Sequence, residues 1–412
     1  MLVHWIWLAT RPDISDKLKR EVLTYFSDPE DVFYADAQAL AACPEMTEQA
    51  AGALMDKKLD TAWRIIEICK HKAIHILTYR DAGYPKRLKN IADPPLVLYY
   101  KGRLPDFDAQ PFIGVVGTRG ASAYGLNMAK KMGYQIACCG GAVVSGAAEG
   151  IDAAAMTGAL TGNGTVVGIL GCGVDRVYPA CNRALFADTE RYGCLISEFV
   201  PGTQPYGWNF PKRNRLISGL SSGVLVVEAP QKSGSLITAR QAADQGRDVF
   251  VIPGNADNPN CVGSNALLRD GGIMVSSGWD VVSEYEAQFP GKLRASDQPL
   301  PLVLQPDRTE ETVAKVAQPV QLPVTKKENS GRNDKKDIDK RPNTPYSGTE
   351  KALPPLNAQE QAIVNELKQG DRLTDDVIVA TGIGAGQMLG LLTMLEIKGV
   401  ISRLPGNRIG LK

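Results

Sequence analysis

Short apolar runs alternate with helix-length segments between residues 111 and 285. The runs are almost continuously apolar, which is typical of parallel strands buried on both faces. Strands separated by about 10–15 helical residues form βαβ units. The sequence therefore predicts an α/β fold with a doubly wound, mostly parallel sheet, and strands at Phe112–Val116, Ala142–Ser145, Thr165–Leu170, Cys194–Phe199, Val224–Glu228, Asp248–Ile252 and Ile273–Ser276.

With 412 residues, the chain is too long for a single hydrophobic core. Residues 1–85 carry apolar side chains at three- and four-residue spacing, which predicts a small helical domain. The predicted sheet and its helices should form a Rossmann-like domain at 86–288. A disordered linker is expected at 289–352, because Pro323–Lys351 contains eight Lys or Arg, five Asp or Glu and few large hydrophobes. The apolar repeat of the helical domain comprises Leu18, Val22, Leu23 and Phe26, then Trp63, Ile66 and Ile68 near Leu59.

The last segment, 353–412, is predicted to be compact again. Three helices followed by a hairpin make a winged-helix arrangement. The third helix carries little positive charge, so it fits a protein contact or a weak DNA contact better than sequence reading. The expected helices are Ala358–Lys368, Thr374–Ala380 and Ala385–Lys398, and the expected hairpin strands are Val400–Leu404 and Arg408–Leu411.

Composition narrows the function. The eight cysteines include no C-x-x-C pair, which argues against a zinc ribbon or a redox motif and fits a reducing cytosol. The net charge is +1, so affinity for nucleic acid must come from a local basic patch. No stretch reaches the roughly 18 apolar residues of a membrane span, and the start lacks the features of a signal peptide. We therefore expect a cytoplasmic protein without a membrane span.

The first predicted strand leads into the turn Gly117-Thr118-Arg119, and a helix follows. Glycine lets backbone approach a phosphate, the helix start offers free N–H groups, and Arg119 adds a bidentate donor. The next strand ends at Gly146, and both ends should lie at the edge where open α/β sheets bind ligands. Neither G-x-G-x-x-G nor a P-loop occurs, so we expect no nucleotide cofactor. Tight turns and close helix–sheet packing are the alternative explanation for such glycines.

The segment Tyr206–Arg215 combines aromatic and basic residues. Aromatic rings stack on bases while Arg and Lys bind phosphates, which is the composition of a single-strand binding site. The alternative is an ordinary helix start with solvated charges. The candidate residues here are Trp208, Phe210, Lys212, Arg213 and Asn214.

A further helix start follows at Ser233-Gly234-Ser235, where serine can cap the helix and free N–H groups can bind an anion. Glu228 precedes it at a strand end. We interpret this carboxylate as a structural partner for Arg213 or Arg215 instead of a catalytic base. All three histidines lie in the first 75 residues, so a serine nucleophile in this region would lack a histidine base.

Many short motifs occur here in one order: Gly117-Thr118-Arg119, Ser145-Gly146, Gly150-Ile151-Asp152, Tyr178-Pro179, Phe210-Pro211-Lys212-Arg213-Asn214-Arg215, Ser233–Thr238 and Gly263-Ser264-Asn265. In order and spacing they resemble the DprA/Smf family of DNA-processing proteins over about residues 75–285. The flanking domains fit as well, the first as a SAM or helix-hairpin-helix-like domain. The resemblance implies a non-enzymatic protein that binds and protects incoming single-stranded DNA and helps to load the RecA recombinase in natural transformation. It also implies a homodimer formed through the Rossmann-like domain.

Carried over by position, the resemblance places Gly117, Thr118, Arg119, Phe210, Lys212, Arg213 and Asn214 in the DNA pocket. Our own interpretation of strand ends, aromatic residues and helix starts adds Gly146, Trp208, Ser233, Gly234 and Ser235. The chain departs from the family where cations are usual, at Glu149, Met156, Ala180 and Gly207. Glu149 either faces the DNA or pairs with Arg119 or Arg176.

Two alternatives stay open at this point. One is a nucleotide-binding or nucleoside-monophosphate-cleaving enzyme on a related Rossmann-like scaffold. That class carries P-G-G-x-G-T-x-x-E, whose nearest approach here is Pro253-Gly254-Asn255. The other is a structural scaffold that joins partners through its winged helix.

Overall fold

The computed structural model describes residues 1–296, 298, 300, 358–368, 370–383, 388, 391–392, 394–396, 398, 400–404 and 408–411. These residues fall into two compact units, one within 1–312 and the other within 313–412. The predicted linker, 289–352, lies outside the described residues except near its beginning.

The first unit contains a nine-stranded sheet with the order β1-β2-β6-β5-β4-β3-β7-β8-β9. Neighbouring strands from β6 to β9 are parallel, whereas β1 with β2 and β2 with β6 are antiparallel. The strand order reverses at β3, which lies between β4 and β7, and the predicted doubly wound sheet is confirmed. The strands are β1 (His75–Thr78), β2 (Val97–Gly102), β3 (Phe112–Val116), β4 (Ala142–Ser145), β5 (Val166–Ile169), β6 (Cys194–Ser197), β7 (Gly223–Val226), β8 (Asp248–Val251) and β9 (Ile273–Met274).

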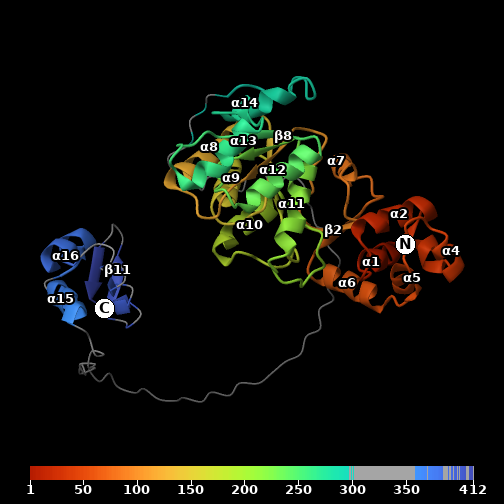
Figure 1. Cartoon of the computed structure of the whole chain (residues 1–412), viewed down its shortest axis with the longest axis horizontal. Coiled ribbons are helices and arrows are strands. Elements are labelled where there is room, and N and C mark those ends of the chain that lie inside the picture. Colours follow the sequence, from red (N-terminus) through yellow and green to blue (C-terminus); the bar gives the residue numbers. More distant parts are fainter. Residues whose placement is uncertain are drawn as a thin grey trace, which may run out of the picture. The chain divides into compact units, whose positions relative to one another are not determined.

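Helices cover both faces of this sheet, as βαβ crossovers require (Figure 1). One hydrophobic core lies under α8, α9, α10 and α14, and a second lies under α7, α11 and α12. The helices of this part are α7 (Lys86–Lys89), α8 (Ala123–Cys138), α9 (Ile151–Thr161), α10 (Arg183–Tyr192), α11 (Asn209–Leu220), α12 (Gly234–Asp244), α13 (Val262–Arg269) and α14 (Gly278–Val282).

The seven predicted strands are all present, and Phe112–Val116 and Ala142–Ser145 begin and end as predicted. Strands β1 and β2 are additional. β1 precedes the predicted domain boundary at residue 85, yet it is part of the central sheet. At the other end, Phe289 and Leu293 are buried in the core, so packed structure continues beyond the predicted boundary at 288.

The N-terminal helices gather around the start of the chain (Figure 1), as the apolar spacing predicts. Side chains of Ser15, Asp28, Asp36 and Thr47 cap four of them. Trp63 lies in a helix, as the apolar spacing predicts, but half of its side chain is exposed, and the buried stripe of α6 runs through Ala62, Ile65, Ile66 and Cys69. The helices are α1 (Leu2–Ala9), α2 (Asp16–Phe26), α3 (Pro29–Tyr34), α4 (Ala37–Ala41), α5 (Glu48–Met55) and α6 (Asp60–His71).

The second unit has its own core and a three-stranded sheet of order β10-β12-β11. The first two predicted helices and the hairpin are confirmed, whereas the third, Ala385–Lys398, lies partly outside the described residues. The elements are α15 (Ala358–Leu367), β10 (Arg372–Leu373), α16 (Thr374–Thr381), β11 (Ile401–Leu404) and β12 (Arg408–Leu411). Among the helices that the structure describes, none is long and apolar enough to cross a lipid bilayer.

A buried group of ion pairs fixes the position of α11. The Arg215 guanidinium lies 2.7 Å from Glu198 and 2.7 Å from Asp93, and it reaches Asp16 of α2 at 3.5 Å. Burial raises the pKa of Glu198, and the charge of Arg215 opposes that rise. The network therefore joins α11 to the helical N-terminal part and to the segment that follows β6.

Replacing Arg215 with methionine should destabilise the first unit by about 3 kcal/mol, because Glu198 would keep a buried charge without its main partner. Urea denaturation followed by circular dichroism measures the change. Arg64→Met, at an exposed arginine of α6, serves as the control and should shift stability by less than about 0.5 kcal/mol. Equal stability of Arg215→Met and the parent protein would contradict this assignment.

Candidate nucleic-acid interface

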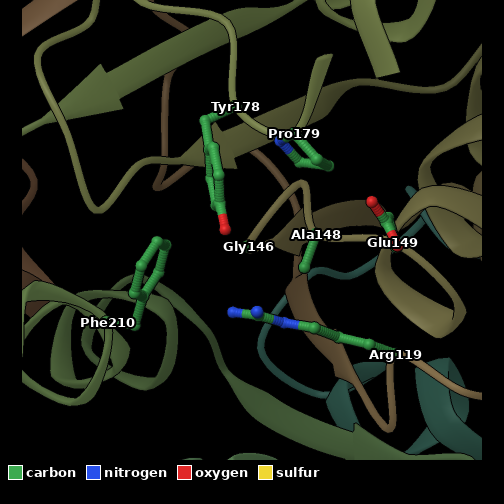
Figure 2. A pocket seen from close by; sticks show the side chains of 7 residues that line it. All are labelled: Arg119, Gly146, Ala148, Glu149, Tyr178, Pro179 and Phe210. Carbon is green, nitrogen blue, oxygen red and sulfur yellow. The ribbon is translucent and has the colours of Figure 1, made fainter. Parts of the chain in front are cut away.

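A hollow of about 200 Å³ opens where strands β3, β4 and β5 end (Figure 2). Its walls come from the turn after β3, the loop after β4, the segment after β5 and the first turn of α11. Ligands of doubly wound sheets bind at this edge. The lining residues are Arg119, Gly146, Ala148, Glu149, Tyr178, Pro179 and Phe210. The structure thus brings together three predicted site residues, Arg119, Gly146 and Phe210.

One cation and two aromatic rings face this hollow. The Arg119 guanidinium lies 5.3 Å from the centre of the Phe210 ring, toward which it points in Figure 2. The Tyr178 and Phe210 rings are tilted by 39° with their centres 5.7 Å apart. Arg119 is exposed and forms no ion pair within the part of the chain that the structure describes. This cation is therefore available to an anionic ligand.

Arg213 lies behind the hollow and is only 4% exposed. Its Nη1 donates to the carbonyl oxygens of Gly146, at 2.9 Å, and of Ile169, while its Nε donates to Asn214. Burial lowers the pKa of Arg213 to about 10, so the side chain stays charged at neutral pH. The sequence predicts direct DNA contact here, but the structure commits these donors to the protein itself. Arg213 positions the walls of the hollow.

Gly146 is placed where a side chain would not fit. A Cβ atom at this residue would lie 2.5 Å from Nη2 of Arg213 and 2.6 Å from Oδ2 of Asp152. The Gly146 N–H donates to that Asp152 oxygen at 3.1 Å. Burial raises the pKa of Asp152, and the charge of Arg213 opposes the rise. The glycine is thus explained by close packing against two buried charged groups.

The turn residues Gly117 and Thr118 support Arg119. The Thr118 N–H donates to the Glu228 carbonyl at 2.8 Å, and the Thr118 hydroxyl accepts from the Gly120 N–H at 3.3 Å. Gly117 packs against Ile151 of α9. Neither Gly117 nor Thr118 lines the hollow. Both residues instead shape the turn that presents Arg119.

Five predicted site residues lie away from the hollow. The Lys212 ammonium is paired with Asp16 at 2.8 Å and is about half exposed. Asn214 is buried and donates to the Gly234 carbonyl at 3.3 Å. Ser233 caps α12 and hydrogen-bonds Ser235 through its hydroxyl at 2.7 Å. These residues join α11 to its neighbours in this structure.

The predicted partnership of Glu228 is corrected, and of the two alternatives for Glu149 the pairing with an arginine is not found among the described contacts. Glu228 is buried, but it accepts from the backbone N–H of Ser122 at 2.9 Å and from its hydroxyl, at the start of α8, and not from Arg213 or Arg215. A helix N-terminus supplies donors close by, so no arginine is needed. Glu149 accepts from the Cys181 thiol at 3.2 Å and pairs with neither Arg119 nor Arg176 among the described contacts.

Trp208 forms a surface feature beside the start of α11. It is 72% exposed, and its ring stacks on Tyr206 with centres 4.7 Å apart and an angle of 7°. Tyr206 is not among the predicted site residues. The i, i+2 spacing of two aromatic residues in a loop was the available signal. Stacking on one side leaves the Trp208 ring presented to solvent.

Two family models match this chain. DNA recombination-mediator protein A matches residues 75–286, and the DprA winged helix domain matches residues 347–407. The chain belongs to the DNA recombination-mediator protein A family. The predicted resemblance to DprA/Smf proteins and the predicted C-terminal winged helix are thereby confirmed.

Individual members of the family agree with this assignment. The protein Smf of Synechocystis is 33% identical over 349 residues, which cover 84% of this chain and 82% of the relative. The DNA processing protein DprA of Streptococcus pneumoniae is 39% identical over 56% of this chain and 79% of its own length. The X-ray structure of DprA from that species superposes with a TM-score of 0.59 and 32% identity, covering 69% of this chain and 98% of the other.

Proposed function

We propose that this protein binds single-stranded DNA at the hollow beyond β3, β4 and β5. The observation that carries the proposal is a cation, Arg119, which forms no ion pair with any residue that the structure describes and lies beside the rings of Tyr178 and Phe210. Single-strand binding proteins combine cations for the backbone with aromatic faces for the bases. The hollow, of about 200 Å³, is smaller than the roughly 300–1,000 Å³ of small-molecule sites, so in our proposal it takes only part of a nucleotide, such as one base.

The Trp208 ring extends this site along the strand. It lies two residues before Phe210, so a base stacked on it and a base in the hollow belong to one short stretch of DNA. Lys212 lies two residues beyond Phe210 but is held by Asp16. In our proposal Arg119 contacts phosphate, whereas Phe210, Tyr178 and Trp208 contact bases.

Family membership supports the wider role. We infer that the protein protects incoming single strands and helps to load the RecA recombinase during natural transformation, in the cytoplasm where RecA acts. We also infer a homodimer through the Rossmann-like domain. The role that we infer is non-enzymatic, and the carboxylate that follows β7, Glu228, supports this because it is buried and bound to the start of α8.

Arg119→Ala should weaken binding of oligo-dT and oligo-dA alike by about tenfold, the loss of one charge-assisted hydrogen bond. The slope of log affinity against log salt should fall by about 0.7 per lost phosphate contact. Fluorescence anisotropy of labelled oligonucleotides at two salt concentrations measures both. The control is Arg240→Ala, which removes the same charge from an exposed position on α12. An unchanged isotherm for folded Arg119→Ala, or an equal loss in the control, would refute the contact.

Trp208→Ala should lower affinity by about 1–3 kcal/mol, the contribution of one stacked base, with little change in salt slope. Its melting temperature should stay the same, because the ring is mostly exposed. Trp63→Ala removes another exposed tryptophan, in α6, and should bind like the parent. Phe210→Ala tests the second ring in the same titration. If neither Trp208→Ala nor Phe210→Ala weakens binding, base stacking at this site is wrong.

A further inference from the structure

Glu149 is the anomaly of the hollow, because a carboxylate lines a site proposed to bind a polyanion. Its position is built by the surrounding backbone. Gly150 has φ +78°, and a Cβ atom there would lie 2.4 Å from the Thr118 carbonyl and 2.6 Å from that of Arg119. The glycine therefore lets the Glu149 loop pack directly on the turn that carries Arg119.

Asn182 holds the same loop from its other side. Its side-chain amide donates to the carbonyl oxygens of Ala147, at 3.0 Å, and Ala148, at 3.1 Å. The hydrogen bonds of Asn182 and the packing of Gly150 on the Arg119 turn together fix the backbone around Glu149. The Glu149 side chain thus extends from a restrained loop at the edge of the hollow.

The Glu149 carboxylate keeps acceptor positions for a ligand. One oxygen accepts from the Cys181 thiol at 3.2 Å, which is a weak donor, and an ionised carboxylate has about four acceptor positions. Glu149 is exposed and takes part in no ion pair among the residues with described coordinates. Figure 2 shows its carboxylate directed toward the Pro179 side and the Arg119 guanidinium directed toward Phe210. The negative and positive groups therefore occupy separate sides of the hollow.

This separation of charge favours the phosphate of a nucleotide on one side of the hollow and its base edge on the other. Phosphate is attracted by Arg119 and repelled by Glu149, whereas N–H groups on a base edge are attracted by a carboxylate. A base beside the Phe210 and Tyr178 rings can then present its edge to Glu149 while its phosphate stays with Arg119. We propose that Glu149 accepts hydrogen bonds from the base edge and gives the hollow a preference for guanine in single-stranded DNA. This inference rests on the single-strand binding proposed above.

Guanine follows from the donor pattern of the bases. A carboxylate accepts only, so it suits an edge with two adjacent donors. The Watson–Crick edge of guanine offers its ring N–H beside its amino group. Adenine and cytosine each offer an amino group beside a ring acceptor, and thymine offers one N–H between two carbonyl oxygens. Guanine should therefore bind most tightly and thymine least.

The test compares three labelled oligonucleotides of equal length by fluorescence anisotropy with the full-length protein. They are an alternating guanine–thymine strand, its inosine–thymine counterpart, which lacks only the guanine amino group, and oligo-dT. We expect the guanine strand to bind roughly tenfold more tightly than oligo-dT, with the inosine strand between them. Glu149→Gln should bind all three within about twofold, because an amide presents a donor beside its single oxygen.

A control variant and a competing free nucleotide distinguish the ways in which the proposal can fail. Glu286→Gln, at an exposed glutamate outside the hollow, should keep the guanine preference of the parent. Equal binding of all three strands by the parent, or a guanine preference that survives Glu149→Gln, would overturn the proposal while single-strand binding stands. Displacement of the guanine strand by free GMP as effectively as by the unlabelled strand would also overturn it, since the ligand would then be a free nucleotide. Binding of none of the strands would instead refute the proposed function.

Discussion

The candidate site depends on the hydrogen bonds that the buried guanidinium of Arg213 donates. A buried charge is costly unless hydrogen bonds and an opposite charge compensate for it. Here the carbonyl oxygens of Gly146 and Ile169 accept hydrogen bonds from this guanidinium, and Asp152 supplies the opposite charge nearby. Gly146 directly follows β4, and Ile169 is the last residue of β5. One side chain of α11 therefore holds the ends of both strands at fixed positions. The hollow lies in front of that connection.

A second set of charges connects the site to the N-terminal helices. Asp16 of α2 bonds Lys212 and contacts Arg215, and Arg215 is bound in turn by Glu198 and Asp93. Burial on its own would raise the pKa of Asp16, but its hydrogen bond with Lys212 and the neighbouring cations outweigh burial and lower the pKa. The stability that Asp16 contributes is therefore present above its usual pKa and is lost as the pH falls through the lowered value. Helix α11 thus has a site-facing side and a side that docks the helical part.

The sequence predicts the fold better than it predicts the site. Continuous apolar runs identify every parallel strand, because burial on both faces leaves a strong pattern. The run from Leu96 to Tyr100 carries a similar signal for β2, but β1 has only four residues beside a helix and is hard to distinguish. In α11, helical spacing puts Phe210, Arg213 and Asn214 on one side and Lys212 with Arg215 on another. Sequence alone could not show which side is buried, since the partner of Lys212 is Asp16, far away in the chain.

Photochemical cross-linking can show which side chains touch the bases of bound single-stranded DNA. Oligo-dT carrying 5-iodouracil, bound to the full-length protein and irradiated, forms covalent bonds with aromatic side chains that touch its bases. Mass spectrometry then locates the modified residues. We expect cross-links at Tyr178, Phe210 or Trp208, and their loss when unlabelled oligo-dT competes. Cross-links confined to the N-terminal helices or to residues 358–411, with none around the hollow, would contradict it.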